Sequence, residues 1–223
     1  MSANPSSKKL IVEGDIDGSF FEAFCYSIGY RKKEIWVGPP ADYAAGKGRG
    51  KGNAIDLFVD LVGELRDGRV SRLGLIVDAD YASKGGLGYS GTLEHISGKL
   101  GPLDYAPISD GEEGIVFAHA GGLPDIGVWI MPNNRNEGYL EDFCIGIAAR
   151  SEATLLRRAR TAVTDIDTPK FPAHFKTKAE MATWLAWQEV PGQKLAALIG
   201  NNLIDTTSPK FLALKKWLKR TFD

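Results

Sequence analysis

The chain has 223 residues, which is enough for one large domain or for one domain with a small appendage. Hydrophobic residues make up 43% of it and charged residues 25%, a composition typical of a globular protein with a sizeable core. Its 27 basic and 28 acidic residues give a net charge of −1, which argues against a protein that coats nucleic acid through bulk charge. An enzyme that acts on nucleic acid is not excluded, because a metal-binding carboxylate cluster cancels basic residues in a count over the whole chain.

Two cysteines are too few for a disulfide scaffold, and the apolar segments are too short to predict a membrane partner. Cys25 and Cys144 both have apolar neighbours, so we expect two buried free thiols. No uninterrupted apolar run approaches the roughly 20 residues of a membrane-spanning helix. The first nine residues are polar and lack the apolar part of a signal peptide. These features predict a cytoplasmic protein.

Strands and helices are predicted to alternate in the first part of the chain. The apolar run at residues 8–13 ends on Glu13, and Gly14 separates it from an apolar-rich segment that stops at Gly29. This is the pattern of a strand, a tight turn and a helix. The next expected elements are a short strand at 34–37, a loop rich in Gly, Pro and Lys at 38–53, and a helix at 53–66.

A second apolar strand leads into a pair of aspartates. The run LGLIV at 73–77 is too short and too β-branched for a helix, and it ends on Asp78-Ala79-Asp80. The elements expected after it are a helix at 92–100 and strands at 114–118 and 126–130. Strands alternating with helices predict an α/β fold, with a parallel sheet that is covered on both faces. In such sheets, functional groups gather beyond the carboxyl ends of the strands.

Helices dominate the pattern from residue 138 onward. They are expected at 138–149, 151–163, 177–187, 193–200 and 208–221. The proline-containing segment 164–176 is the best candidate for a boundary. We therefore predict an α/β domain at residues 1–163 and a C-terminal helical extension at 164–223 that packs on it.

Acidic side chains follow two separate predicted strands. By themselves, Asp78 and Asp80 would fit a turn or a helix cap, where aspartate is common. Glu13 ends a different strand, and strand-terminal acids in a parallel sheet must either repel one another or share cations. Carboxylate oxygens are the ligands that Mg²⁺ prefers. The sequence therefore predicts a magnesium site formed by Glu13, Asp78 and Asp80.

The segments that carry these acids resemble a known family. LIVEGDIDGSFFEAF, followed by LGLIVDADYA, is similar to the Toprim domain of topoisomerases, bacterial primases, ribosomal-RNA maturases and OLD-family nucleases. IGVWIMPNNRNEGYLEDF, KAEMATWLAWQ and PGQKLAALIG are similar to a small stand-alone family of OLD-like Toprim proteins of unknown function. The resemblance covers nearly the whole chain. It implies a Toprim-like (Rossmann-like), mainly parallel sheet flanked by helices, with a helical C-terminal part.

The resemblance also implies roles for individual residues. Glu13, Asp78 and Asp80 match the core metal-binding acids, and Asp17 and Glu141 match further acids of the OLD-like nucleases. Lys178 matches an assisting lysine, with Lys176 and Lys194 as rival candidates. Two alternatives stay open, because Glu141 also fits a helix N-terminal acid and Lys178 also fits a solvated lysine in a first helical turn.

These residues suggest hydrolysis of phosphodiester bonds in DNA or RNA. Two Mg²⁺ ions, or Mn²⁺ in their place, about 3.5–4 Å apart would activate a water and stabilise the leaving oxygen. Asp78 would bridge the ions, Glu13 and Asp17 would complete one, and Asp80 and Glu141 the other. Lys178 would neutralise charge on the phosphate.

A glycine-rich basic loop is a candidate contact for nucleic acid. It carries Lys47, Arg49 and Lys51 between glycines. It lacks the Walker A pattern, because Lys51 is followed by Gly52 rather than by Ser or Thr. A flexible loop on a nucleic-acid backbone and a solvated surface loop are both consistent with this sequence. A homo-oligomer is equally open.

Two other functions fit part of the pattern. A regulatory or toxin–antitoxin-like module would bind metal without catalysis. A HAD-like phosphatase also has two aspartates after a strand. However, it typically has Thr or Val at the place of Ala82, and it has no counterpart of Glu13.

Overall fold

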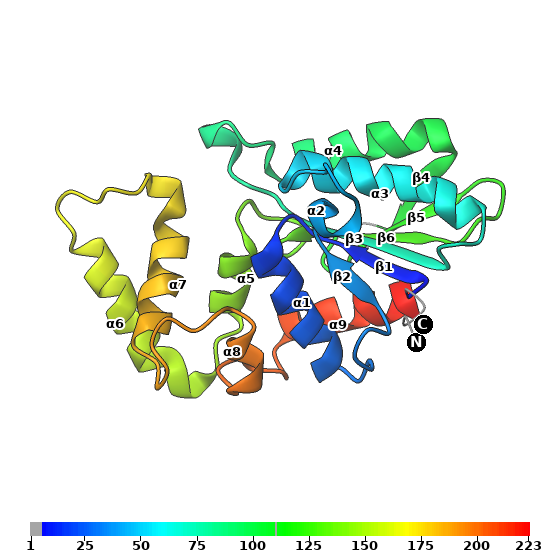
Figure 1. Cartoon of the computed structure of the whole chain (residues 1–223). Helices are drawn as coiled ribbons and strands as arrows, with labels where there is room; N and C mark the ends of the chain where they lie inside the picture. The colour runs from blue at the N-terminus through cyan, green and yellow to red at the C-terminus, as the bar shows by residue number, and fades with distance from the viewer. Residues whose placement is uncertain (1–5, 110) are drawn as a thin grey trace.

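The computed structural model describes residues 6–109 and 111–223, and it has a mixed α/β architecture. Six strands of this described part form one sheet in the order β2-β1-β3-β6-β5-β4 (Figure 1). The strands are β1 (Lys8–Ile11), β2 (Trp36–Gly38), β3 (Arg72–Asp78), β4 (Tyr105–Ser109), β5 (Ile115–His119) and β6 (Ile126–Met131). The mainly parallel sheet flanked by helices confirms the predicted α/β fold class.

Helices cover both faces of the sheet and extend past one of its ends. The α-helices are α1 (Asp15–Ser27), α2 (Pro40–Tyr43), α3 (Lys51–Arg66), α4 (Gly88–Leu100), α5 (Leu140–Gly146), α6 (Ala153–Thr164), α7 (Lys176–Ala186), α8 (Ala197–Gly200) and α9 (Pro209–Phe222). Figure 1 shows α3 and α4 on one face of the sheet and α1 and α9 on the other, with α6 and α7 set apart from the sheet.

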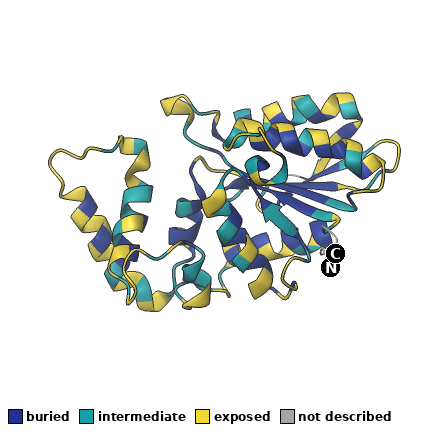
Figure 2. Cartoon of the chain, in the orientation of Figure 1, coloured by how far each residue is buried: buried dark blue, intermediate teal, exposed yellow. Residues whose placement is uncertain are grey.

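The central strands are buried on both faces because helices cover both. Along β3, Leu75 and Val77 face the core beneath α3 and α4, whereas Ile76 between them faces the core on the other side. This is the two-residue period of a strand. All six residues of β6 are buried (Figure 2). Strands covered on both faces need apolar residues at nearly every position, and the sequences of β3 and β6 show this pattern.

The edge formed by β4 and β5 differs from the prediction. β1, β2, β3 and β6 pair in parallel, but β5 pairs antiparallel with both β6 and β4. Only residues 120–125 separate β5 from β6, which is too short for the crossover that a parallel pair requires. β4 was not predicted as a strand at all. It contains Pro107 and is largely exposed, and proline is tolerated at such an edge.

Several helix boundaries also differ. The predicted loop at 38–53 contains the short helix α2, and α3 already begins at Lys51. α4 begins at Gly88, four residues before the predicted start. In each case the helix begins among glycines or prolines, which the periodicity of apolar residues does not reveal.

The last helix lies against the sheet rather than apart from it. Trp217 and Phe222 of α9 are fully buried, and Trp217 Nε1 donates a hydrogen bond of 3.4 Å to the carbonyl oxygen of Ile115 in β5. α9 passes close to the sheet because Gly74 and Gly127, which are paired in adjacent strands, have no side chains there. The division predicted after residue 163 stays a prediction, since one hydrophobic cluster runs from β1 to α9.

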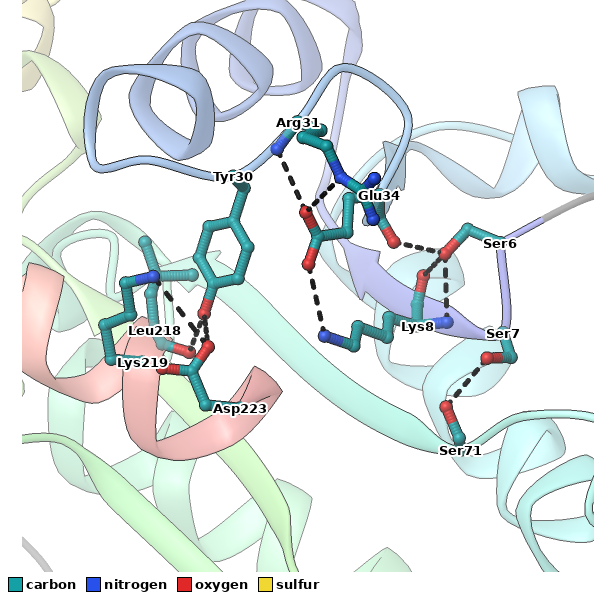
Figure 3. Close-up of polar contacts among 10 residues, drawn as sticks. All are labelled: Ser6, Ser7, Lys8, Tyr30, Arg31, Glu34, Ser71, Leu218, Lys219 and Asp223. Atoms are coloured by element: carbon teal, nitrogen blue, oxygen red, sulfur yellow. Dashed lines mark hydrogen bonds and ion pairs between the residues drawn. The ribbon is translucent and has the colours of Figure 1, made fainter.

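Polar contacts at the two ends of the described chain support this arrangement (Figure 3). The Tyr30 hydroxyl donates to Asp223 Oδ1 at 2.8 Å, and the ammonium of Lys219 lies 3.9 Å from the centre of the Tyr30 ring. The hydroxyls of Ser7 and Ser71 are 2.8 Å apart, next to β1 and β3. The contacts of Tyr30 join the loop after α1 to the end of α9, and the serine pair joins the starts of β1 and β3.

The two thiols agree with the prediction made for them. Cys25 and Cys144 are buried and unpaired. Among residues 6–109 and 111–223, no helix combines the length and the apolar character that a bilayer crossing requires.

Gly127→Ala tests the packing of α9 on the sheet. A Cβ atom there would collide with the Thr221 side chain and lie 3.1 Å from the Trp217 ring. We expect the free energy of unfolding to fall by about 1–3 kcal/mol, because extra atoms in a well-packed core force side chains and backbone to shift. Urea denaturation measures this change. Gly63→Ala is the control, because Gly63 is exposed in α3 with open space around it. This variant should be more stable than the parent by roughly 0.5–1 kcal/mol, since alanine favours a helix over glycine. Equal stability of the two variants would contradict the packing described here.

Candidate acidic site

Glu13 and Asp78 lie beside each other because β1 and β3 are parallel neighbours in the sheet. Parallel strands end at the same edge, so the residues that follow them meet. Glu13 Oε1 accepts a hydrogen bond of 2.7 Å from the backbone N–H of Asp78. Burial raises the pKa of Glu13 to about 7, even though this hydrogen bond and the charge of Lys51 favour the carboxylate.

Asp78 connects the sheet to the first turn of α5. Its Oδ1 accepts a hydrogen bond of 2.9 Å from the backbone N–H of Leu140, the first residue of α5. Free N–H groups at a helix N-terminus are natural partners for a carboxylate. Burial, and then the charges of Glu13 and Asp17, raise the pKa of Asp78 well above its usual range. α5 is thus held at the acidic edge of the sheet.

Asp17 reaches the same place from the first turn of α1. Burial raises the pKa of Asp17 to about 6, and the negative charge of Glu141 adds to this effect. Glu141 stands in the first turn of α5. The first turns of α1 and α5 therefore each bring an acid toward Asp78.

Lys51 neutralises the rim of the site at Asp80. Its ammonium lies 2.5 Å from Asp80 Oδ2 and donates a hydrogen bond of 3.1 Å to the carbonyl oxygen of Ala79. Asp80 has a φ of 62°, a left-handed conformation that aspartate adopts more readily than most residues. Two backbone hydrogen bonds with Gly138 hold it there. The Lys51 side chain is only 13% exposed, so this ion pair is largely shielded from water.

Lys178 of α7 neutralises the opposite rim at Glu141. The ammonium lies 2.8 Å from Glu141 Oε2 and 4.4 Å from the centre of the Tyr139 ring. Burial lowers the pKa of Lys178, but the charges of Glu141, Asp78 and Asp17 outweigh this effect and raise it. The lysine therefore stays charged beside the acids.

The charges at this edge do not balance. Five carboxylates, from Glu13, Asp17, Asp78, Asp80 and Glu141, meet two ammonium groups, from Lys51 and Lys178. Within the described part of the chain, Glu13, Asp17 and Asp78 have no ion-pair partner within 4 Å. These three acids also have the raised pKa values. A hard divalent cation with oxygen ligands would relieve the repulsion between them.

The side chains do not form a ready-made cage. Among residues 6–109 and 111–223, no group of three or more His, Cys, Asp or Glu side chains is already arranged to hold a metal ion. Asp80 and Glu141 are engaged by lysines, and Glu13 and Asp78 each use one oxygen to accept a backbone hydrogen bond. The donor chemistry fits Mg²⁺, but the side chains would have to turn to bind it.

The structure separates the basic residues that the sequence grouped in one loop. Lys47 pairs with Asp60 at 2.7 Å, and Arg49 pairs with Asp15 at 2.9 Å, both near the surface. Lys51 instead belongs to the acidic site. The signal that could have revealed this is Gly50, which precedes helical apolar spacing from Ala54 onward and makes Lys51 the first helical residue.

The pH dependence of stability tests the cost of ionising Glu13 in the fold. Its pKa is about 7 in the fold, against 4.5 when unperturbed. Below about pH 4 the carboxyl is protonated in both the folded and unfolded states, so it costs no stability. As pH rises through about 7, the folded state must ionise a desolvated group, and stability is lost. We expect metal-free Glu13→Gln to be more stable than the parent by on the order of 2 kcal/mol at pH 8, and not at pH 4.

Urea denaturation in chelator at the two pH values measures this difference. Glu94→Gln, at an exposed position of α4, is the control and should change stability little at either pH. A loss of stability in Glu13→Gln at pH 8 would show that its charge is already well compensated.

A double-mutant cycle tests the ion pair between Lys51 and Asp80. We expect metal-free Lys51→Met to lose roughly 1–2 kcal/mol, because Asp80 loses its shielded partner, and the added change Asp80→Asn to recover part of it. The exposed pair of Lys47 and Asp60 is the matched control and should give a coupling of roughly 0–1 kcal/mol. Thermal and urea unfolding give both values, and equal coupling in the two pairs would rule out a special role for Lys51.

Comparison with known families gives one match. A family described as "Protein of unknown function (DUF3226)" matches residues 7–223, and no Toprim family does. The expected membership of the Toprim or OLD-like family is therefore wrong, because a glutamate and two aspartates after parallel strands form too short a pattern to define a family. No curated protein and no solved structure matches the chain. Since the match covers nearly all of the sequence, the chain belongs to the DUF3226 family.

Proposed function

We propose that this protein is a Mg²⁺-dependent hydrolase of phosphodiester bonds in nucleic acid, with Mn²⁺ as a substitute ion. The observation that carries the proposal is the meeting of Glu13, Asp17 and Asp78, each half-buried and without an ion-pair partner among the described residues, beside the charged Lys178. A group of desolvated acids without cationic partners costs the fold stability, and such perturbed groups cluster at functional sites.

The candidate ligands divide into two groups by their present partners. Glu13, Asp17 and Asp78 would hold one ion, and Asp80 and Glu141 would join Asp78 around a second. A bound divalent ion would supply Lewis-acid activation of water and neutralisation of phosphate oxygens. Asp80 and Glu141 would first have to release Lys51 and Lys178.

Lys178 is the best candidate for a contact with the phosphate. It is charged, and its side chain is 36% exposed, so it can leave Glu141 for a phosphate oxygen. In the reaction, a water oxygen bonds to phosphorus, the ester bond to the leaving oxygen breaks, and that oxygen takes up a proton. A fixed ammonium would stabilise the negative charge that develops on the phosphate.

The loop before α3 supports a nucleic-acid substrate. Arg49 lies over the first turn of α1 through its pair with Asp15, and both side chains are more than half exposed. A strand bound at the acids would find Arg49 close to its backbone, whereas Lys47 is held at Asp60 of α3 and stays a predicted contact. DNA and RNA are both compatible with these contacts.

Self-association into a homo-oligomer also stays a prediction, and sedimentation of the purified chain would test it.

Metal binding and cleavage by Asp78→Asn test the proposal. The parent protein should gain about 2.7 kcal/mol of stability when Mg²⁺ is present at about 100 times its Kd. It should also cleave DNA or RNA only without chelator. Asp78→Asn should lose the metal-dependent stabilisation, and cleavage should fall by roughly a hundredfold or more. Asp56→Asn is the control, since Asp56 is an exposed residue of α3 away from the acids.

The same experiment separates the competing functions. Metal stabilisation without cleavage of single-stranded, duplex or structured nucleic acid would favour a non-catalytic metal-binding module. Trapping of an aspartyl phosphate with a fluoride analogue would favour a HAD-like phosphatase. Full Mg²⁺-dependent cleavage by purified Asp78→Asn would overturn the proposed mechanism.

A further inference from the structure

A cavity of about 400 Å³ opens directly beside the acidic site. Its walls come from the first turns of α1, from α5 and α7, and from the segment 193–195 that follows α7. Glu141 and Lys178 are part of these walls. The cavity is therefore continuous with the place where we propose that a phosphate binds.

Most of the cavity wall is apolar. Met181, Leu185 and Leu195 are buried residues that line it. Ile16 also lines it and is 61% exposed, in the same helical turn as Asp15 and Asp17. A large exposed apolar side chain beside two acids contributes little to the core. It offers instead a surface for a flat, weakly polar group.

The segment 193–195 adds polar groups to this wall. Gln193 Oε1 accepts a hydrogen bond of 2.7 Å from Asn201 Nδ2, and among the described residues the Gln193 amide N–H groups have no acceptor. Lys194 is exposed, and it has no ion-pair partner in the part of the chain that the structure describes. The cavity thus combines an apolar wall, a free amide donor and a free positive charge.

We propose that this cavity holds the base of an unpaired nucleotide next to the phosphodiester that is cleaved, with Lys194 on a neighbouring phosphate. This inference rests on the proposed function of the acidic site. Each phosphate of a nucleic acid is flanked by nucleosides, so a phosphate at Lys178 has a base within reach of the cavity. The volume lies in the range of roughly 300–1,000 Å³ that is usual for small-ligand pockets. The faces of a base suit the apolar wall, and its edge suits the Gln193 amide.

The cavity therefore predicts a preference for single-stranded or looped substrates. Bases in a duplex are stacked and paired, and extruding one costs a few kcal/mol. Unpaired bases avoid this cost and gain contact with the apolar wall.

Filling the cavity with Ala182→Phe tests the inference. Ala182 lines the cavity from an exposed position of α7, and Ala186→Phe is the matched control on the same helix, exposed and outside the cavity. Binding of a fluorescein-labelled single strand and of its duplex is measured by anisotropy in Ca²⁺. We expect Ala182→Phe to weaken single-strand binding by roughly tenfold and Ala186→Phe to leave it unchanged. The stabilisation by Mg²⁺ should be the same in both variants.

Lys194→Ala is a second variant that leaves the cavity intact, with Lys176→Ala as its control. We expect Lys194→Ala, but not Lys176→Ala, to weaken the binding of single strands. The dependence of this binding on salt concentration should also become less steep in Lys194→Ala. The inference is overturned if Ala182→Phe binds and cleaves single strands like the parent, or if duplex binds as well as single strand. If Ala182→Phe selectively loses single-strand binding but the parent cleaves nothing, the cavity site stands and the proposed hydrolase function fails.

Discussion

β1 and β3 are parallel neighbours, and this pairing brings two half-buried carboxylates to one edge of the sheet. Glu13 accepts a hydrogen bond from the backbone of Asp78, so the two acids cannot move apart without disturbing the end of β3. Burial raises the pKa of both groups. Their charge must be met by protons, by lysines or by cations, and the surrounding residues are arranged around this requirement.

The two lysines meet it only at the rim. Lys51 engages Asp80 and Lys178 engages Glu141, while the acids between them remain uncompensated within the described structure. Neutralising all of the acids with lysines would leave no affinity for a cation. If none of the five acids had a lysine partner, the fold would lose more stability than it does with three unpaired acids. Under the proposed function, this division would leave a place for a divalent ion and keep positive charge next to it for an anionic substrate.

The helices after β6 supply what the sheet lacks. The hydrogen bond from the Leu140 amide to Asp78 holds α5 at the acidic edge, and α7 packs against α5 and carries Lys178. The same helix provides the apolar wall of the adjoining cavity. The C-terminal helices therefore contribute to the candidate site as well as to the core.

The sequence by itself determined the central strands and the acids that follow them. Short β-branched runs such as 73–77 are local signals, and a residue placed directly after such a run must lie at the sheet edge. Only the tertiary structure decided which long side chains join these acids. Lys51 looked like part of a mobile loop, and Lys178 could not be told from Lys176 or Lys194, because a lysine's partner depends on how separate helices pack. The antiparallel edge of β4 and β5 was missed for a similar reason, since pairing direction follows from the path of the chain in space.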